Sequence, residues 1–260
     1  GTEVAVKECF PGTELDKYFE REVTILREAR HPNVVQFMDI CAHEKYYIVT
    51  EYVSGGNLKE WIRDKEKPCT LELCISFATD MARALAFLHA RDIIHRDIKA
   101  ENLLITENGR VKVCDFGFSR LAAKGAEEMK RISYCGTDEY MAPEIMLGME
   151  FGTAVDIFSF GMILGELLTR SMIEDGLLQR EIPGFSLLAS SLTDNLYHTP
   201  ACPVQEDLVS LCLSCTRASE EERPKWAETL RDLRLIQLSI PNPSHPGTYQ
   251  GRRDDGVYRE

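Results

Sequence analysis

Two short segments of the chain contain polar residues that could take part in catalysis. Both segments are flanked by apolar residues. The first reads HRDIKAEN, at residues 95–102, and the second reads VCDFG, at residues 113–117. They contribute the carboxylates of Asp97 and Asp115 and the amide of Asn102. Carboxylate and amide oxygens suit Mg²⁺, which keeps several waters and shares its remaining positions with substrate phosphates. A site of this kind fits phosphoryl transfer, where positioning and charge neutralisation carry most of the rate.

A predicted hairpin brings these segments together. The stretch LLITENGRVKVCDF holds two short apolar strands around the Asn-Gly pair at 108–109, which a two-residue type I′ turn prefers. The turn folds the chain back, so that Asp115 returns close to Asp97 and Asn102, and Lys99 can reach the same space. Clustered carboxylates repel one another unless a cation lies between them, so we expect a metal site here.

The surrounding pattern predicts a sheet-rich first part. Alternating, valine-rich runs predict strands at about residues 2–9, 33–40 and 45–53, and apolar positions at helical spacing predict a helix over 14–30. The triplet SGG at 54–56 then supplies a flexible break.

The second part is predicted to be mainly helical. Apolar residues three or four apart follow Thr70, which we expect to cap a long helix. Further helices are predicted at about 153–169, 204–215 and 225–238. The stretch at 240–260 has too few apolar groups to offset its ordering entropy, so we expect a disordered tail.

Composition narrows the setting and the partners. The 260 residues are 44% hydrophobic, and no run of eighteen apolar residues or signal peptide occurs. Nine cysteines without regular spacing favour a reducing compartment, and we expect a cytoplasmic location. The formal charge of -12 makes nucleic acid and anionic membrane poor partners and favours basic substrates, although acidic excess also serves solubility.

The motifs resemble those of a known family. HRDIKAEN, CDFG and MAPE at 141–144 resemble the catalytic loop, the metal-binding triplet and the end of the activation segment of eukaryotic protein kinases, in the expected order. VAVK at 4–7 precedes them and GTAVDIFSFG at 152–161 follows. The resemblance implies an α+β, two-lobed protein kinase fold with a small β-rich lobe and a larger helical lobe.

The resemblance also implies domain boundaries. Residues 1–53 would form a partial first lobe with the hinge, 54–239 the helical lobe and 240–260 the tail. The chain begins at Gly1, after the position where kinases carry the glycine-rich loop. We therefore expect a truncated first lobe that lacks the strands of this loop, either because the sequence is cut or because the parent protein lacks the loop.

Roles for the phosphate-handling residues follow from the resemblance. Asp97 falls at the catalytic base, and Lys99 falls where a cation steadies the γ-phosphate. Asn102 and Asp115 fall at the positions that bind Mg²⁺, with Mn²⁺ as the alternative ion. ATP is the implied nucleotide. Lys7 aligns with the lysine that grips the α- and β-phosphates, and Glu22 with its helix partner, whereas a surface ion pair is the alternative for these two.

The nucleotide base is implied to lie between the lobes. Thr50 resembles the gatekeeper residue, and Glu51, Tyr52 and Val53 resemble the hinge that meets adenine. Ala5 and Leu104 would sandwich the ring. Ordinary core packing is the alternative for the apolar members of this set.

Regulation is implied in residues 115–144. Arg96 would pair with a phosphate on this loop, and Ser133 is the expected acceptor, phosphorylated by an upstream kinase or by the protein itself. Thr137 would lie at the substrate hydroxyl site. Structural roles are implied for Asp156, which would bind the catalytic-loop backbone, and for two residues that would form an ion pair, Glu144 and Arg223.

The cysteines near these motifs receive structural interpretations. Cys114 precedes Asp115 and could be a reactive thiol, but a buried cysteine that packs as a small hydrophobe is the favoured interpretation. Cys212 and Cys215 form a lone CxxC without a second ligand pair, so we assign them to helix packing rather than zinc.

Further motifs indicate a kinase subtype, and two other functions compete with the kinase interpretation. Lys99 and the segment YCGTDEYMAPE resemble serine/threonine kinases, and DIFSFGMILGELL resembles the tyrosine-kinase-like group on its LIM-kinase side. Glu101 and Glu166 occupy positions that in some kinases receive a substrate arginine. The main rival is a pseudokinase scaffold, disfavoured by the intact polar positions. A metal phosphohydrolase would need more clustered histidines than His95 offers.

Overall fold

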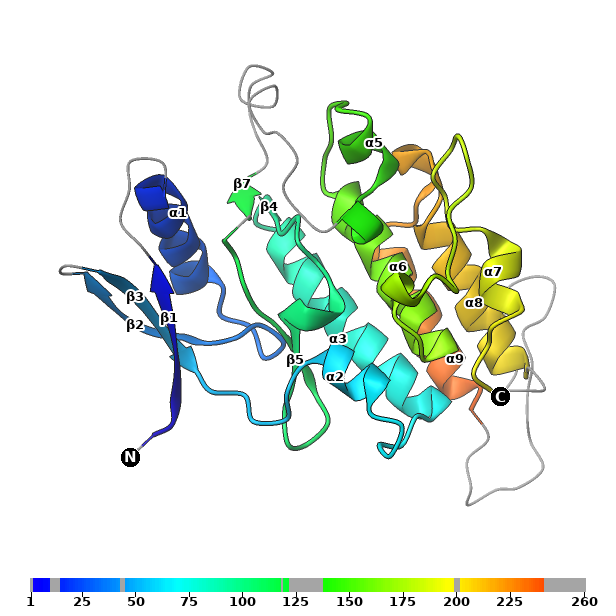
Figure 1. The fold of residues 1–260 in the computed structure, drawn as a ribbon, viewed down its shortest axis with the longest axis horizontal. Helices are drawn as coiled ribbons and strands as arrows, with labels where there is room; N and C mark the ends of the chain where they lie inside the picture. The colour runs from blue at the N-terminus through cyan, green and yellow to red at the C-terminus, as the bar shows by residue number, and fades with distance from the viewer. Residues whose placement is uncertain are drawn as a thin grey trace.

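The computed structural model describes residues 2–9, 15–42, 45–117, 119–121, 138–198 and 202–240. Within these ranges the chain forms a small lobe of one sheet and one helix and a larger lobe built mainly of helices (Figure 1). The predicted α+β, two-lobed fold is thus confirmed. Ser133, Thr137 and the predicted tail after residue 240 lie outside the described residues, and the boundaries at 53 and 239 stay predictions.

The sheet of the small lobe has three antiparallel strands in the order β1, β3, β2. These strands are β1 (Val4–Cys9), β2 (Phe37–Ala42) and β3 (Tyr46–Glu51). Helix α1 (Leu15–Glu28) packs beside the sheet, where the Phe19 ring stacks on Tyr46 with centroids 4.6 Å apart. The helix is therefore packed against the sheet through β3.

The second strand begins four residues later than predicted, because the chain before it pairs with the other lobe. Val34 forms a parallel bridge with Val113, and the Val35 N–H donates to the Val113 carbonyl at 2.9 Å. The Val113 N–H in turn donates to the Asn33 carbonyl at 2.9 Å. This short pairing joins the small lobe to the strand that precedes Asp115.

The larger lobe is a helix assembly with two small two-stranded sheets. Its helices are α2 (Leu58–Arg63), α3 (Leu71–His89), α5 (Pro143–Met146), α6 (Ala154–Thr169), α7 (Ala189–Thr193), α8 (Pro203–Cys215) and α9 (Trp226–Leu238). Its strands form the pairs β4 (Ile93–Ile94) with β7 (Arg120–Leu121) and β5 (Leu103–Ile105) with β6 (Val111–Val113). The longer helices match their predicted ranges, and the Thr70 hydroxyl accepts from the Leu73 N–H at 3.3 Å as the predicted cap.

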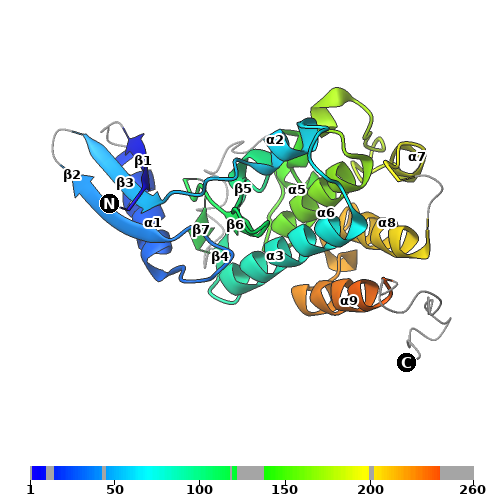
Figure 2. The same ribbon diagram turned by 90° about the horizontal axis from the view of Figure 1, so that it is seen from below.

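Helix α6 forms the centre of this lobe. Every residue of α6 after Ala154 is buried, as expected of a helix that is packed on all sides. It contacts α3 and α8, while α9 lies along α3 (Figure 2). Among the described helices, none is both long enough and apolar enough to cross a membrane.

The hairpin between Asp97 and Asp115 forms, but its turn differs from the prediction. The Gly109 N–H donates to the Thr106 carbonyl, and the Thr106 N–H donates to the Arg110 carbonyl, both at 2.9 Å. The loop therefore has three residues, 107–109, and only Gly109 takes a positive φ, of 69°. The two-residue type I′ turn is wrong, because one left-handed glycine after a turn already reverses the strands.

The flexible break predicted at 54–56 is also wrong. A Cβ at Gly55 would lie 2.2 Å from the Ile105 carbonyl oxygen, so only glycine fits against β5. The Ile105 N–H donates to the Gly56 carbonyl at 2.8 Å, and Gly56 has a φ of 76°. These glycines permit close packing of two backbones rather than motion.

Candidate active site

The catalytic-loop side chains form one hydrogen-bonded group. The Asn102 amide nitrogen donates to the Asp97 carbonyl at 2.8 Å and to Asp97 Oδ2 at 3.0 Å. The Lys99 ammonium lies 3.1 Å from the same oxygen. Asp97 Oδ1 is buried and has no hydrogen-bond partner among the described residues. One carboxylate oxygen is thus fixed in place, while the other remains available as an acceptor.

Backbone geometry near these side chains is strained. Arg96 and Asp115 have positive φ values of 71° and 61°, which residues other than glycine rarely adopt. Asp156 on α6 stabilises the backbone conformation at Arg96. Its Oδ1 accepts from the Arg96 N–H at 2.9 Å, and its Oδ2 accepts from the His95 N–H at 2.8 Å. The contact predicted between Asp156 and the loop backbone is confirmed.

Asp156 is itself held by two residues that the sequence did not indicate. His89 Nε2 lies 2.8 Å from Asp156 Oδ2, and the Trp226 indole N–H donates to His89 Nδ1 at 2.6 Å. Because Nδ1 accepts, His89 carries its hydrogen on Nε2 and donates it to the carboxylate. A buried chain of hydrogen bonds therefore runs from α9 to the backbone next to Asp97.

A second polar group joins the small lobe to the segment after β6. Lys7 of β1 donates to both Glu22 oxygens, at 2.9 and 3.0 Å, and to Asp115 Oδ1 at 2.8 Å. The predicted pair of Lys7 and Glu22 is thus present. A Cβ at Gly117 would lie within 3.5 Å of all three charged side chains, so glycine leaves room for them to meet.

The charges of this group are set by burial and by one another. Burial works to lower the pKa of Lys7, but the charges of Glu22 and Asp115 outweigh it and hold that pKa above its usual value. Burial would raise the pKa of Asp115, yet the Lys7 charge and the Gly117 N–H lower it. Burial raises the pKa of Glu22, and Lys7 offsets only part of that increase. Lys7 and Asp115 are therefore both ionised at neutral pH.

The oxygen donors near both groups fit a hard divalent cation. Asn102 uses its amide nitrogen on Asp97, which leaves its oxygen as an acceptor. Asp115 is ionised, and its side chain is 38% exposed. One amide and one carboxylate match Mg²⁺, which keeps waters and binds substrate phosphates. The described residues contain no group of three histidine, cysteine or acidic side chains that could hold a metal by itself.

The residues expected around a nucleotide base come from strands of both lobes. Ala5 of β1 is paired with Thr50 of β3, and Leu104 lies on β5. The Glu51 carboxylate is held in place, because its Oε1 accepts from Lys112 at 2.6 Å and from the Gln36 N–H at 2.7 Å. The Glu51 backbone N–H also donates to the Gln36 carbonyl, at 2.9 Å. The two residues that follow differ in exposure: Val53 is buried and Tyr52 is exposed.

The end of the activation segment is tied down by a buried ion pair. Arg223 donates to the two Glu144 oxygens at 2.6 and 2.7 Å, and both side chains are almost fully buried. The predicted pair is confirmed. Arg96 lies 5.5 Å from the Phe151 ring centroid, and its proposed partner loop falls largely in residues 122–137, outside the described part of the chain.

Two acidic residues expected to face a substrate arginine differ in accessibility. Glu101 is partly exposed and pairs with Lys59 at 2.8 Å. Glu166 is completely buried and accepts from the Tyr140 hydroxyl at 2.7 Å and the Ile173 N–H at 2.9 Å. In this structure Glu166 therefore holds the interior of the helical lobe together and is closed to a substrate side chain.

The cysteines near the motifs behave as packing residues. Burial raises the pKa of Cys114 to about 12, so its thiol stays protonated and unreactive at neutral pH. Cys212 and Cys215 are both buried in α8, and burial raises the pKa of each thiol. The packing interpretation of these residues is the one that the geometry favours.

A further anchor of the hairpin was not foreseen from the sequence. Asp80 is buried in α3 and accepts from Arg110 Nε at 2.8 Å and from the Val111 N–H at 3.0 Å. Asn33 donates from its side chain to the Val111 carbonyl at 2.9 Å. A polar residue among the apolar positions of a predicted helix, such as Asp80, is the signal that could have indicated such an anchor.

The fold has two lobes and belongs to the α+β class. Lys7 and Glu22 come from its small lobe, and Asp97 and Asn102 come from the catalytic loop of the larger one. This combination of fold and residues is that of the protein kinases. The comparison with family profiles agrees, since the protein kinase domain profile matches residues 1–233. The chain therefore belongs to the protein kinase domain family.

Three similar proteins from Dictyostelium discoideum illustrate the relationship. The chain is 39% identical over 244 residues to RasGEF domain-containing serine/threonine-protein kinase X, covering 92% of the chain and 25% of that protein. It is 38% identical over 245 residues to probable serine/threonine-protein kinase kinY, covering 88% of the chain and 42% of that protein. It is 30% identical over 284 residues to kinase and exchange factor for Rac A, covering 92% of the chain and 22% of that protein. The chain thus spans less than half the length of these relatives.

Proposed function

We propose that this chain transfers the γ-phosphate of ATP to serine or threonine hydroxyls of protein substrates. The observation that carries the proposal is the Asp97 carboxylate, with one oxygen fixed by Asn102 and Lys99 and the other buried without a partner among the described residues. A carboxylate held in this way can accept the proton of an attacking hydroxyl. The names of the relatives support the serine/threonine specificity.

The remaining polar residues receive roles in the same reaction. Lys99 neutralises charge on the transferred phosphate, and Lys7, held by Glu22, binds the phosphates that stay on the nucleotide. Asn102 and Asp115 would hold Mg²⁺, or Mn²⁺ in its place, and the bound ion supplies neutralisation of the phosphate oxygens. Because Lys7 and Asp115 stay ionised at neutral pH, the chain presents both charges before substrate arrives.

We also propose the nucleotide site and the mode of control. Adenine would lie between Ala5 and Leu104 and meet the backbone of Glu51 and Val53, with Thr50 at the back of the site. Phosphorylation of Ser133, by an upstream kinase or by the protein itself, would give Arg96 an anionic partner and order the segment that holds Thr137.

The cellular setting and subgroup are proposals of the same kind. The cysteine usage and the motif DIFSFGMILGELL favour a cytoplasmic kinase of the tyrosine-kinase-like group, on its LIM-kinase side. Glu101 is the one of the two acidic positions that remains partly exposed for a basic substrate. No nucleic acid or membrane is required for this function.

The test compares three purified proteins: wild type, Asp97→Asn and Asp194→Asn, the last a control at an exposed carboxylate on the surface. Each receives Mg²⁺, ATP labelled in the γ-phosphate and a basic protein acceptor. We expect wild type and the control to transfer phosphate, and Asp97→Asn to be about 10²- to 10⁴-fold slower, as loss of a general base requires. If folded wild type binds nucleotide but transfers none, or if Asp97→Asn is equally active, the protein is a pseudokinase or uses another base.

A further inference from the structure

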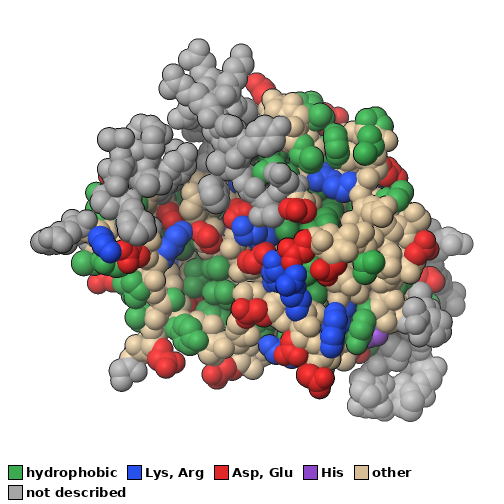
Figure 3. Space-filling model, viewed as in Figure 1, with side chains coloured by type: hydrophobic (Ala, Val, Ile, Leu, Met, Phe, Trp, Pro, Cys, Tyr) green, Lys and Arg blue, Asp and Glu red, His purple; other side chains and the backbone are tan. Residues whose placement is uncertain are grey.

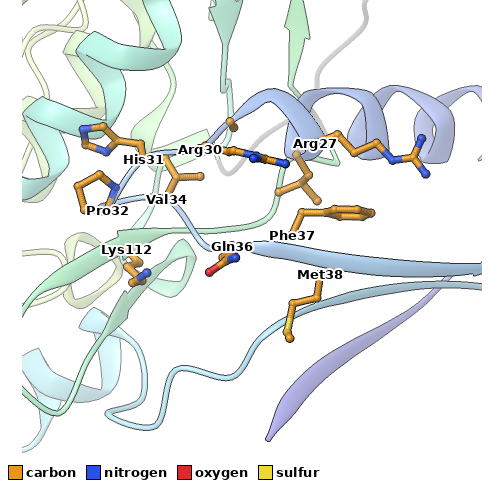
Figure 4. Close-up of a pocket in the computed structure, with 11 residues that line it drawn as sticks. Arg27, Arg30, His31, Pro32, Val34, Gln36, Phe37, Met38 and Lys112 are labelled. Carbon is orange, nitrogen blue, oxygen red and sulfur yellow. The ribbon is translucent and has the colours of Figure 1, made fainter. Parts of the chain in front are cut away.

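A cavity of about 760 Å³ lies between the end of α1 and the start of β2 (Figure 4). Leu26, Ala29 and Val34 contribute buried apolar side chains to its lining. Arg27 comes from the last turn of α1, Arg30 from the segment just after it, and Lys112 enters from β6. The cavity thus combines an apolar floor with cationic walls.

The local charge of the cavity is opposite to that of the chain. Neither Arg27 nor Arg30 forms an ion pair with a carboxylate among the residues that the structure describes, whereas Lys112 is paired with Glu51. Side chains of both signs are interspersed on the face seen in Figure 3, and the chain carries a net charge of -12. Two exposed guanidinium groups beside one cavity are therefore a local exception.

The titration of His31 supports this assignment of charge. His31 lines the cavity. Burial lowers the pKa of His31, and the positive charges of Arg83, Arg91 and Lys112 lower it further against the opposing charge of Asp80. Arg83 and Arg91 lie toward and just after the C-terminal end of α3, so cationic side chains of the larger lobe also act on the His31 side of the cavity.

The strand beside the cavity offers a further surface. Within the described sheet, β2 is one of the two outer strands and pairs only with β3, so its other edge has backbone groups that an extended peptide can use. Phe37 and Met38 at the start of β2 line the cavity, and Met38 is exposed. An extended chain along this edge would place alternate side chains over the cavity.

We propose that this cavity binds an extended acidic segment of a partner protein, with an apolar side chain seated on Leu26 and Val34 and acidic side chains paired with Arg27 and Arg30. Guanidinium and carboxylate groups form two parallel hydrogen bonds, which gives such a pair both strength and direction. The apolar floor favours a peptide over a nucleic acid, because a nucleic acid has no apolar side chain to fill it.

Docking here has a consequence for the proposed kinase activity. Arg27 lies five residues after Glu22 on the same helix, so a segment bound to both arginines restricts the motion of α1 and stabilises the contact between Glu22 and Lys7. This consequence rests on the proposed function, whereas binding of the peptide does not.

The binding test uses a fluorescein-labelled peptide of acidic residues around one central leucine, with fluorescence anisotropy as the readout. A matched peptide has asparagine and glutamine in place of the acids. We compare wild type with Arg27→Glu/Arg30→Glu and with Arg231→Glu/Arg234→Glu on α9, where two exposed arginines undergo the same change in charge. Arg27→Gln/Arg30→Gln serves as a second variant that adds no negative charge near the helix end.

We expect wild type and the α9 variant to bind the acidic peptide alike, and both cavity variants to bind it at least about tenfold more weakly, since each removes two charge-assisted contacts. Binding should weaken as sodium chloride is raised. Equal loss in the cavity and α9 variants, equal binding of the amide peptide, or equally tight binding of a single-stranded RNA that the cavity variants also lose would overturn the proposal. Peptide binding without phosphoryl transfer would leave this site standing and remove the proposed activity.

Discussion

Individual buried carboxyl groups in this molecule take opposite protonation states according to their partners. Burial would raise the pKa of Asp156, but the hydrogen bonds that it accepts from His89 and from the His95 N–H lower it. Glu166 is surrounded by the neutral donors of Tyr140 and Ile173, and burial raises its pKa to about 8. At neutral pH Asp156 is therefore ionised, whereas most Glu166 carboxyls are protonated.

This difference predicts how stability depends on pH. The native state keeps the Glu166 proton up to about pH 8, while the unfolded chain releases it near the usual value of 4.5. The native state therefore binds more protons between these values, and the contribution of Glu166 to the free energy of unfolding falls as pH rises through that range. We expect Glu166→Gln to flatten this decline in urea denaturation at a series of pH values. The exposed Glu206→Gln should keep the wild-type slope, and a wild-type slope in Glu166→Gln would refute the assignment.

Trp226 allows a prediction about positioning. Its indole N–H fixes the hydrogen of His89 on Nε2, and Asp156 then holds the backbone beside Asp97. Given the proposed function, we expect Trp226→Phe to lower kcat by about tenfold, as loss of one buried hydrogen bond allows, with a smaller change in KM for ATP. The ring ¹⁵N signals of His89 should report a mixture of tautomers.

The control for Trp226 is the other tryptophan of the chain. Trp61 is similarly buried, and its ring packs edge-on against Phe77 in the same lobe. Trp61→Phe should lower stability by a comparable amount while leaving kcat and the His89 signals unchanged. An equal fall in kcat for both variants would reduce Trp226 to a packing residue.

Elements near the site are short, and tertiary contacts fix them. Strand β4 has two residues and β5 and β6 have three each, too few to be stable by themselves. The hairpin of β5 and β6 is held on α3 by Asp80 and on the segment between β3 and α2 by the hydrogen bond from the Ile105 N–H to the Gly56 carbonyl. The position of these short strands therefore depends on close contacts with their neighbours.

The closest of these contacts predicts the effect of one methyl group. We expect Gly55→Ala to lower the free energy of unfolding by about 1–3 kcal/mol, because its Cβ would overlap the Ile105 carbonyl and force two backbones apart. Gly152→Ala is the control, since a Cβ there meets no atom within 4 Å. Chemical denaturation of both variants measures the difference, and equal stabilities would contradict the packing described for Gly55.

At the scale of the whole molecule, segments distant in sequence are joined by buried polar links. Arg223 and Glu144 lie 79 residues apart and form a pair with side chains 0% and 6% exposed. Arg223 also donates to the carbonyls of Arg217, Ala218 and Ala154. The segment that ends the activation loop is thereby fixed to the loop before α9.

Breaking this pair should be costly. Arg223→Met leaves the Glu144 carboxylate buried without its partner, and we expect a loss of about 3–5 kcal/mol in the free energy of unfolding. The neighbouring pair of Arg217 and Glu222 is exposed and 3.6 Å apart, so Arg217→Ala should cost less than about 1 kcal/mol. The double variant Arg223→Met/Glu144→Leu should recover part of the loss in the same denaturation experiment. A loss from Arg223→Met no larger than that from Arg217→Ala would show that the pair contributes little.

The sequence by itself was sufficient for the features that depend on local pattern. The long helices, the cap at Thr70 and the hairpin follow from periodicity and turn residues, which act over a few residues. The pairing of Lys7 with Glu22 follows from the resemblance of the motifs to those of protein kinases. Gly109 indicated that the chain reverses direction but not which turn type it forms. A hairpin loop can be built with one left-handed residue or with two.

Only the tertiary structure decided which residues meet across long separations. The contact of Gly55 with β5, the burial of Glu166, the chain from Trp226 to Asp156 and the cationic cavity at Arg27 all join residues from different elements. Their energies come from burial and from distances between atoms, which no local pattern contains. The same side chain is therefore a solvated charge or a buried acid according to the fold around it.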